Sequence, residues 1–192
     1  LAYGAKQLAA AGIPGDHIFL LHDKSDNPKL RPSFANIERQ LNLVLNLAEA
    51  EDLVILAFSG HGVHLNGKSY LCPADCTLEK AETLISVDGI YDQLQECAAR
   101  FKLVLVDACR NDPRPGGSRG MTAYEGKRTL AQSLQSLKGP EGVVLLNSCA
   151  PGEISWEDEK FGHGVFMHYL LDGMRGAADL TADGSVSLNE LQ

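Results

Sequence analysis

Three short apolar runs alternate with polar segments along the chain, at residues 53–58, 103–106 and 142–146. Runs of this length, apolar throughout and rich in β-branched residues, are typical of strands buried on both faces. Residues 17–21 form a further short apolar run, which predicts another strand. Asn66-Gly67, between two segments of alternating pattern, predicts a β-hairpin.

Helical patterns fill the intervals between these runs. An alanine-rich segment at 1–11 ends at Gly12, a common helix stop. Ser33 is suited to cap a helix with apolar positions at helical spacing. Residues 87–99 and 165–170 show similar spacing, and 129–137 shows it weakly. The apolar positions expected to face the core are Phe34, Ile37, Leu41, Leu45, Ala48, Ile90, Leu94, Cys97, Val165, Phe166, Tyr169 and Leu170.

Strands that alternate with helices predict a three-layer α/β/α fold with a mainly parallel central sheet. At 192 residues the chain is expected to form a single domain over 1–192. Residues 110–127 contain several glycines, prolines and basic residues with little to pack, and we predict a long mobile loop there.

Composition limits the kinds of molecule that the protein is expected to bind. The formal net charge of −8 argues against a nucleic-acid surface. No apolar run approaches the length of a membrane span, so no membrane partner is expected. Five cysteines without framework spacing favour reduced thiols and a cytoplasmic protein.

Two segments place reactive side chains directly after predicted buried strands. Ser59-Gly60-His61-Gly62 follows one strand, and Asp107-Ala108-Cys109-Arg110 follows another. The carboxyl ends of neighbouring parallel strands face the same crevice, so His61 and Cys109 are expected to meet there. A thiol beside an imidazole is the arrangement that nucleophilic catalysis requires.

These two motifs resemble the caspase-like cysteine peptidases of clan CD, and among them most closely the bacterial metacaspases and paracaspases. The interval from His61 to Cys109 is 109 − 61 = 48 residues, and in caspases the histidine lies about 50 residues upstream of the cysteine. The resemblance extends over nearly the whole chain and implies the caspase-hemoglobinase form of the α/β/α fold. The strand that precedes the first helix in this family is expected upstream of residue 1.

The resemblance also implies roles. Cys109 would be the nucleophile, His61 the general acid/base, and the N–H groups of Gly62 and Cys109 the oxyanion hole. Asp107 stands where caspases have a glutamine, and with Glu153 it would form an S1 pocket for a basic side chain. Two carboxylates suit a guanidinium best, so substrates with Arg, and less readily Lys, at P1 are expected. An aspartate that caps its own loop is the alternative for Asp107.

The predicted mobile loop contains basic residues itself, which makes self-cleavage between a large and a small segment a hypothesis. The candidate cleavage points are Arg114, Arg119, Lys127 and Arg128. The resemblance implies no required cofactor, and a monomer is favoured over a dimer.

Residues 179–190 follow the twelve-residue EF-hand loop pattern, with Asp179, Asp183 and Glu190 as candidate calcium ligands. Thr181 weakens the match, and no exit helix is evident. A plain turn before a last strand near Leu188 is therefore favoured over a calcium site.

Other motifs have plainer interpretations. Gly116-Gly117-Ser118-Arg119-Gly120 matches a serine nucleophile elbow but lacks the preceding strand. Cys72 and Cys76 have no second ligand pair for zinc, while His64, His163 and His168 are expected to be structural. The rival functions are a catalytically idle interaction module and, on Ser118 alone, a serine esterase.

Overall fold

The computed structural model describes residues 2–10, 12–108, 142–148, 157–158 and 163–191. Contacts divide the chain into two compact units, and each is described by itself. The sheet unit comprises residues 19–154, and the helical unit comprises residues 1–18 with 155–192. The predicted loop at 110–127 and the weak helix at 129–137 lie outside the described residues.

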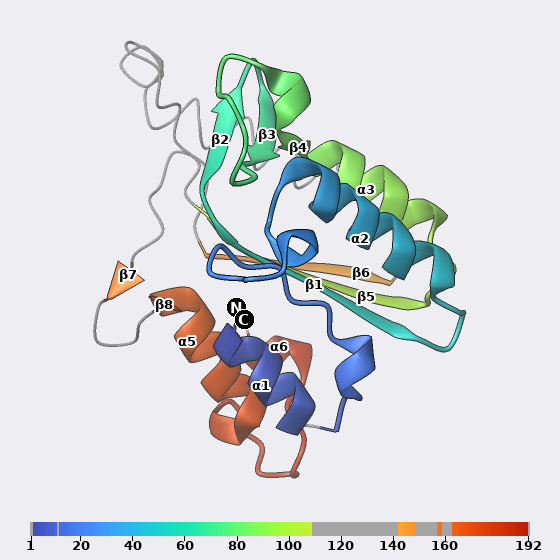
Figure 1. Ribbon diagram of the computed structural model, residues 1–192. Coiled ribbons are helices and arrows are strands. Elements are labelled where there is room, and N and C mark those ends of the chain that lie inside the picture. The colour runs from blue at the N-terminus through green and yellow to red at the C-terminus, as the bar shows by residue number, and fades with distance from the viewer. Residues whose placement is uncertain (1, 11, 109–141, 149–156, 159–162, 192) are drawn as a thin grey trace. The chain divides into compact units, whose positions relative to one another are not determined.

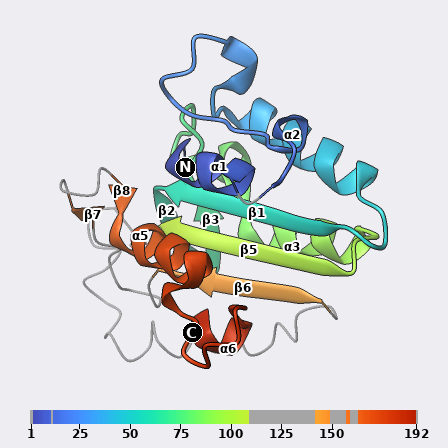
Figure 2. The same cartoon turned by 90° about the horizontal axis from the view of Figure 1, so that it is seen from below.

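The main sheet of the sheet unit contains β1 (Leu53–Gly60), β5 (Phe101–Ala108) and β6 (Val143–Asn147), in the order β1-β5-β6. Both pairings are parallel, and Figure 2 shows the three strands running in the same direction. The three strands and their parallel arrangement are thus confirmed, although only β5 is largely buried. β1 and β5 extend two residues beyond the apolar runs, which brings Ser59 and Asp107 into the ladder.

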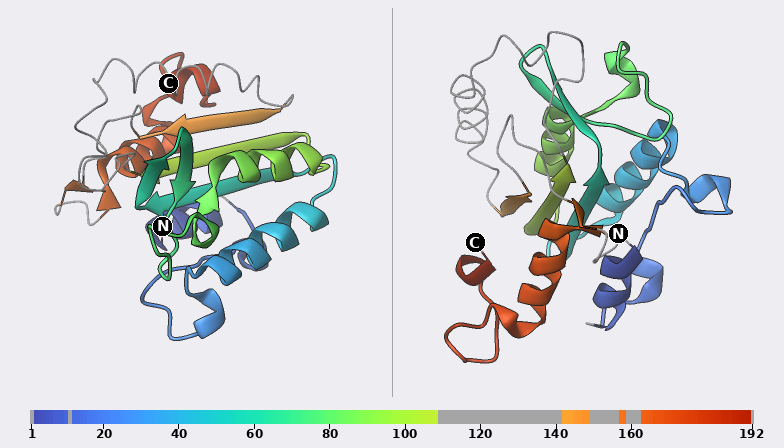
Figure 3. Two further views of the ribbon diagram at one scale, coloured as in Figure 1. Left: turned by 90° about the horizontal axis from the view of Figure 1, so that it is seen from above. Right: turned by 90° about the vertical axis from the view of Figure 1, so that its left-hand side faces the viewer.

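Two helices, α2 (Phe34–Leu47) and α3 (Val87–Glu96), lie side by side over one face of this sheet (Figure 1; Figure 3). Ser33 caps α2 as predicted, its hydroxyl accepting a hydrogen bond from the Asn36 N–H at 3.4 Å. Ser86 caps α3 in the same way. The buried core between helices and sheet includes Leu41, Leu45, Val54, Ile90, Leu94, Cys97, Val104 and Val106.

A small antiparallel sheet contains β2 (Gly62–Leu65), β3 (Lys68–Leu71) and β4 (Ile85–Ser86). Asn66 and Gly67 join β2 to β3, both with positive φ (53° and 79°), as a type I′ turn requires. The predicted hairpin is confirmed. The 3-10 turn η3 (Ala81–Thr83) leads into β4.

The prediction of a strand at residues 17–21 is wrong. The chain forms the 3-10 turn η1 (Gly15–His17) and continues with extended backbone at Ile18, and no strand pairing is assigned there. Phe19 is 45% exposed. An apolar run becomes a strand only where a neighbouring strand accepts its hydrogen bonds. The 3-10 turn η2 (Pro28–Leu30) follows, before α2.

The helical unit contains α1 (Ala2–Ala10), α5 (Val165–Asp172), the π-helical turn η4 (Gly173–Ala177) and α6 (Leu188–Leu191). A two-stranded ladder pairs β7 (Glu157–Asp158) with β8 (His163–Gly164). α1 ends in a Schellman motif, in which the Ile13 N–H donates to the Leu8 carbonyl at 3.1 Å and Gly12 has φ +95°.

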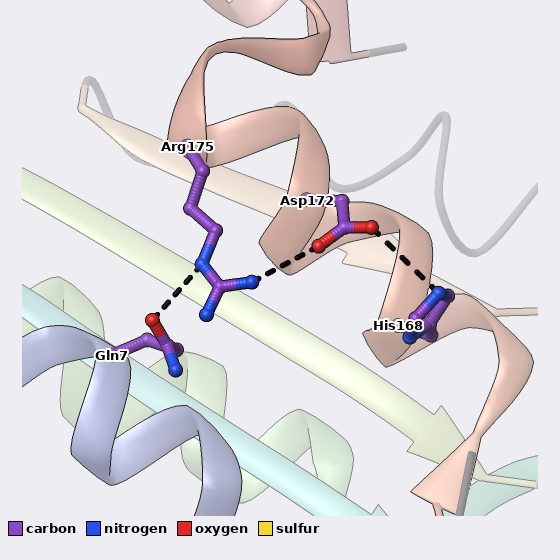
Figure 4. A network of polar contacts seen from close by, with 4 residues as sticks. All are labelled: Gln7, His168, Asp172 and Arg175. Atoms are coloured by element: carbon purple, nitrogen blue, oxygen red, sulfur yellow. Dashed lines mark hydrogen bonds and ion pairs between the residues drawn. The ribbon is translucent and has the colours of Figure 1, made fainter.

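Polar side chains link α1 to the end of α5 (Figure 4). Arg175 donates to the Gln7 side chain at 2.9 Å and to Asp172 at 3.1 Å. The apolar face of α5 differs from the prediction. Tyr169 is 65% exposed, whereas Met167 and Leu171 are buried together with Leu170. Within the described part of the chain, no helix has both the length and the apolar character needed to span a membrane.

We expect the substitution Leu94→Ala to lower the free energy of unfolding by about 2–5 kcal/mol, because it opens a cavity in a close-packed core. Leu94 is fully buried, with 0% exposure. The control is Leu47→Ala at the exposed end of α2, which should change stability by no more than about 0.5 kcal/mol. Urea unfolding of the two variants measures the difference, and equal effects would contradict the described core.

Candidate functional site

The carboxyl ends of β1 and β5, where the two sequence motifs begin, lie at the same edge of the sheet. The register pairs Ser59 with Asp107 and Gly60 with Ala108. Adjacent strands are separated by about 4.8 Å. His61 directly follows Gly60, and Cys109 directly follows Ala108 in the sequence. Cys109 itself lies outside the described residues.

His61 connects the main sheet to the small sheet. His61 is exposed and lies between Gly60, the last residue of β1, and Gly62, the first residue of β2. Its carbonyl accepts a hydrogen bond from the Cys72 N–H at 2.9 Å. Gly62 is buried and pairs with Leu71 in the hairpin. The backbone of His61 is therefore held by both sheets, while its side chain remains accessible.

Asp107 is the only acidic residue among the buried polar residues of the described chain, with 4% exposure. Side chains alternate between the faces of a strand. Because Val104 and Val106 pack under α2 and α3, Asp107 points to the opposite face, as does its partner Ser59. Burial of a carboxylate is costly unless other groups compensate it, so a binding or structural role is expected.

Ser148 adds a third polar residue to this row, and the sequence analysis missed it. It follows Asn147, the register partner of Val106, and its N–H donates to the Val106 carbonyl at 2.9 Å. Its buried hydroxyl makes no hydrogen bond within the described part of the structure. If the ends of the three predicted strands had been placed side by side, Ser59 and Ser148 would both have been indicated as neighbours of Asp107.

Several predicted site residues lie outside the described residues: Cys109, Arg114, Ser118, Arg119, Lys127, Arg128 and Glu153. Of the predicted set, the structure places His61, Gly62 and Asp107 at the same edge of the main sheet, where β1 and β5 end. The histidines considered structural have local partners where they are described. His64 contacts the Ser69 hydroxyl across the hairpin at 3.2 Å, and His168 lies 3.7 Å from Asp172, one turn further along α5 (Figure 4).

The carboxylates of the 179–190 loop accept hydrogen bonds from the loop's own backbone. Asp179 accepts from the Asp183 and Gly184 N–H groups at 3.2 and 3.0 Å. Glu190 accepts from the Ser187 N–H at 2.8 Å and from the Thr181 N–H at 3.2 Å. No group of three or more His, Cys, Asp or Glu side chains within the described ranges is arranged to hold a metal ion.

The predicted last strand near Leu188 is wrong, because the helix α6 begins there. The Ser187 hydroxyl accepts from the Glu190 N–H at 3.4 Å, and the Glu190 carboxylate accepts from the Ser187 N–H. This reciprocal pair is a capping box, which favours a helix over a strand.

Hydrogen bonds in this loop lower the pKa of two carboxyl groups. Those from the Ser187 N–H and hydroxyl, followed by those from Thr181, lower the pKa of Glu190 to about 2. The Ser185 hydroxyl and N–H lower the pKa of Asp183. Hydrogen bonds to an ionised carboxylate favour its charged form.

Comparison with known proteins places the chain in a family. Residues 21–191 match the caspase domain of peptidase family C14. The chain therefore belongs to the caspase domain family, and its α/β architecture, with a parallel sheet and flanking helices, agrees with that assignment. No curated protein matches the sequence.

Solved structures also match, among them a crystal structure of the protein GSU0716 from Geobacter sulfurreducens. The identity is 17% and the TM-score 0.49, over 75% of this chain and 62% of the other. The chain thus spans less than two thirds of that protein's length.

We expect Glu190→Gln to destabilise the protein at pH 7, because the amide accepts the loop hydrogen bonds more weakly than the carboxylate. The pKa of Glu190 is lowered from 4.5 to about 2. Its contribution is therefore present in full above about pH 4.5 and is lost as the pH falls towards 2. Thermal unfolding measured at several pH values from 7 to 2 should show that the difference in Tm between wild type and variant becomes smaller as the pH falls. Glu79→Gln, at an exposed position, is the control; a gap independent of pH would contradict the assignment.

Proposed function

We propose that this caspase-family chain is a cysteine endopeptidase that uses Cys109 as nucleophile and His61 as general acid/base. The observation that carries the proposal is the register of β1 with β5, which pairs Gly60 with Ala108. The next residues along the two strands are His61 and Cys109. Membership of the peptidase C14 family supports the same chemistry.

The proposed reaction proceeds in two steps. The Cys109 thiolate attacks the substrate carbonyl, and the N–H groups of Gly62 and Cys109 stabilise the developing oxyanion. His61 donates a proton to the departing amine, leaving a thioester on Cys109. Water then hydrolyses the thioester with His61 as the base, which releases the acid product and restores the thiol. The exposure of His61 is consistent with this role, because the imidazole must reach a substrate.

The proposed specificity is for Arg at P1, with Lys tolerated. Asp107 supplies a buried carboxylate two residues before Cys109, and Ser59 is its register partner. The unbonded Ser148 hydroxyl on the β6 side is a further group that a polar ligand would satisfy, since a buried hydroxyl without a partner is costly. Glu153 is the proposed second carboxylate, in a bidentate arrangement with the guanidinium.

The proposed substrates are proteins and peptides with an exposed basic residue, bound by a monomer without a required cofactor. Arg114, Arg119, Lys127 and Arg128 are proposed points of self-cleavage. The Asp179, Asp183 and Glu190 carboxylates bind their own loop, so we do not propose calcium as a requirement.

We expect wild-type protein to cleave fluorogenic peptides that end in Arg, more slowly those that end in Lys, and not those that end in Asp. Cys109→Ala and His61→Ala should each lower kcat/KM by at least about a thousandfold, since the nucleophile and its base act together. Ser118→Ala is the matched control and should retain full activity.

The same assay separates the rival functions. An idle interaction module would cleave no peptide, with or without millimolar calcium, and a serine esterase would lose activity in Ser118→Ala but not in Cys109→Ala. Either result would refute the cysteine peptidase.

We expect Asp107→Asn to reduce kcat/KM for Arg peptides by about 10- to 150-fold. This range corresponds to the loss of a hydrogen bond to a charged group, about 1.5–3 kcal/mol. Asp92→Asn, an equal change of charge on the exposed side of α3, is the control and should have little effect. Unfolding measurements must show that both variants remain folded. Unchanged cleavage after Arg in a folded Asp107→Asn protein would exclude Asp107 from S1.

We expect active protein to cut itself within residues 110–128, because basic residues there match the proposed specificity. Mass spectrometry of the purified wild type should find fragments that end at one or more of Arg114, Arg119, Lys127 and Arg128. Cys109→Ala should stay intact under the same conditions. Intact mass in a wild-type sample that cleaves Arg peptides would rule out self-processing.

A further inference from the structure

Two cysteines lie close together in the segment that follows β3. Cys72 is the first residue after that strand, and Cys76 follows four residues later. Both are free thiols and both are half-buried. They pack against the same small apolar cluster, formed by Val63, Leu65 and Leu84. The two side chains are therefore held on one surface and remain partly accessible to small reagents.

The two thiols are also neighbours, because both lie in one short turn and pack against the same cluster, and the Cys76 thiol affects the ionisation of Cys72. Burial, together with the neighbouring Cys76 thiol, raises the pKa of Cys72 to about 12. Cys72 thus keeps its proton at neutral pH. Since the thiolate is the form that attacks a disulfide, Cys76 is the first thiol to react.

The backbone around the pair is fixed at several points. The Cys76 N–H donates to the Pro73 carbonyl at 3.2 Å, which closes a turn between the two cysteines. The Asp75 carboxylate accepts from the Phe34 N–H at 2.8 Å, at the start of α2. This anchoring lowers the conformational entropy that would be lost when the two sulfur atoms are joined.

Two thiols suit a disulfide better than a metal. Structural zinc requires four protein ligands, and within the described residues no cluster of three or more His, Cys, Asp or Glu is arranged to bind a metal ion. A pair of neighbouring thiols, by contrast, needs only the loss of two hydrogens to become a covalent link.

We propose that Cys72 and Cys76 form a reversible disulfide, with a low-molecular-weight disulfide such as oxidised glutathione as the oxidant. The Cys76 thiolate attacks glutathione disulfide, which yields a mixed disulfide and releases one glutathione. Cys72 then loses its proton and, as the thiolate, attacks the Cys76 sulfur, which releases the second glutathione. The protein gives up two electrons and two protons, and glutathione disulfide is reduced to two thiols.

The disulfide acts on the backbone of His61. Formation of the S–S bond brings the two sulfur atoms to about 2.05 Å and so constrains the turn between Cys72 and Cys76. The Cys72 N–H that moves with it donates to the His61 carbonyl at 2.9 Å. Oxidation therefore displaces the proposed general acid/base and lowers peptidase activity. This consequence rests on the proposed function, whereas formation of the disulfide does not.

Tryptic mapping of the folded full chain tests the disulfide. Cleavage after Lys68 and Lys80 releases residues 69–80, which contain Cys72 and Cys76 and no other cysteine. After incubation in oxidised glutathione, the wild-type peptide is expected to lose two hydrogens and to regain them in dithiothreitol. Cys76→Ser should not form this link. Separate glutathione adducts on both cysteines, or an unchanged peptide, would overturn the proposal.

A second experiment measures the peptidase activity of wild type and of Cys76→Ser in the same oxidised and reduced buffers. Both retain Cys109, so oxidation of the nucleophile affects them equally. Wild type should lose the larger fraction of its activity on oxidation, and hydrogen exchange at the Cys72 amide should become faster. Equal losses and unchanged exchange would refute the effect on His61. If reduced wild type cleaves no peptide, the proposed function fails, while the mapping still decides the disulfide.

Discussion

The parallel pairing of β1 with β5 is the constraint on which the rest of the sheet unit depends. All eight residues of each strand are in register. A slip of one position would turn Val104 and Val106 out of the core beneath α2 and α3, because side chains alternate between the faces of a sheet. The burial of these side chains therefore fixes the register, and the register determines which residues end side by side.

The β2–β3 hairpin also holds in place the edge of the main sheet at which β1 and β5 end. β2 begins directly after His61, and the Cys72 N–H binds the His61 carbonyl, so the small sheet positions the same residue that ends the main strand. Such a residue has a rigid backbone and an accessible side chain, a combination that catalysis requires. The turn between Cys72 and Cys76 belongs to this support, which explains why chemistry there is expected to reach His61.

Carboxylates have different surroundings in the two units. Asp107 is buried in a row with Ser59, and Ser148 extends that row with a hydroxyl that has no hydrogen-bond partner among the described residues. In the 179–190 loop, Asp179 and Glu190 are partly exposed and accept hydrogen bonds from backbone N–H groups. The first arrangement suits a ligand, whereas the second stabilises a turn and the start of α6.

The sequence alone determined the three strands of the main sheet, the helix cap at Ser33, the Asn66-Gly67 turn and the order of the His61 and Cys109 motifs along the chain. Each of the structural features depends on local periodicity or on a residue with a particular backbone preference. Only the tertiary structure decided the strand register, and with it the position of Ser148 beside Asp107. It also decided that 17–21 is not a strand and that Leu188 begins a helix. The physical reason is that pairing depends on which distant segment is available to share hydrogen bonds, and a local pattern carries no record of that partner.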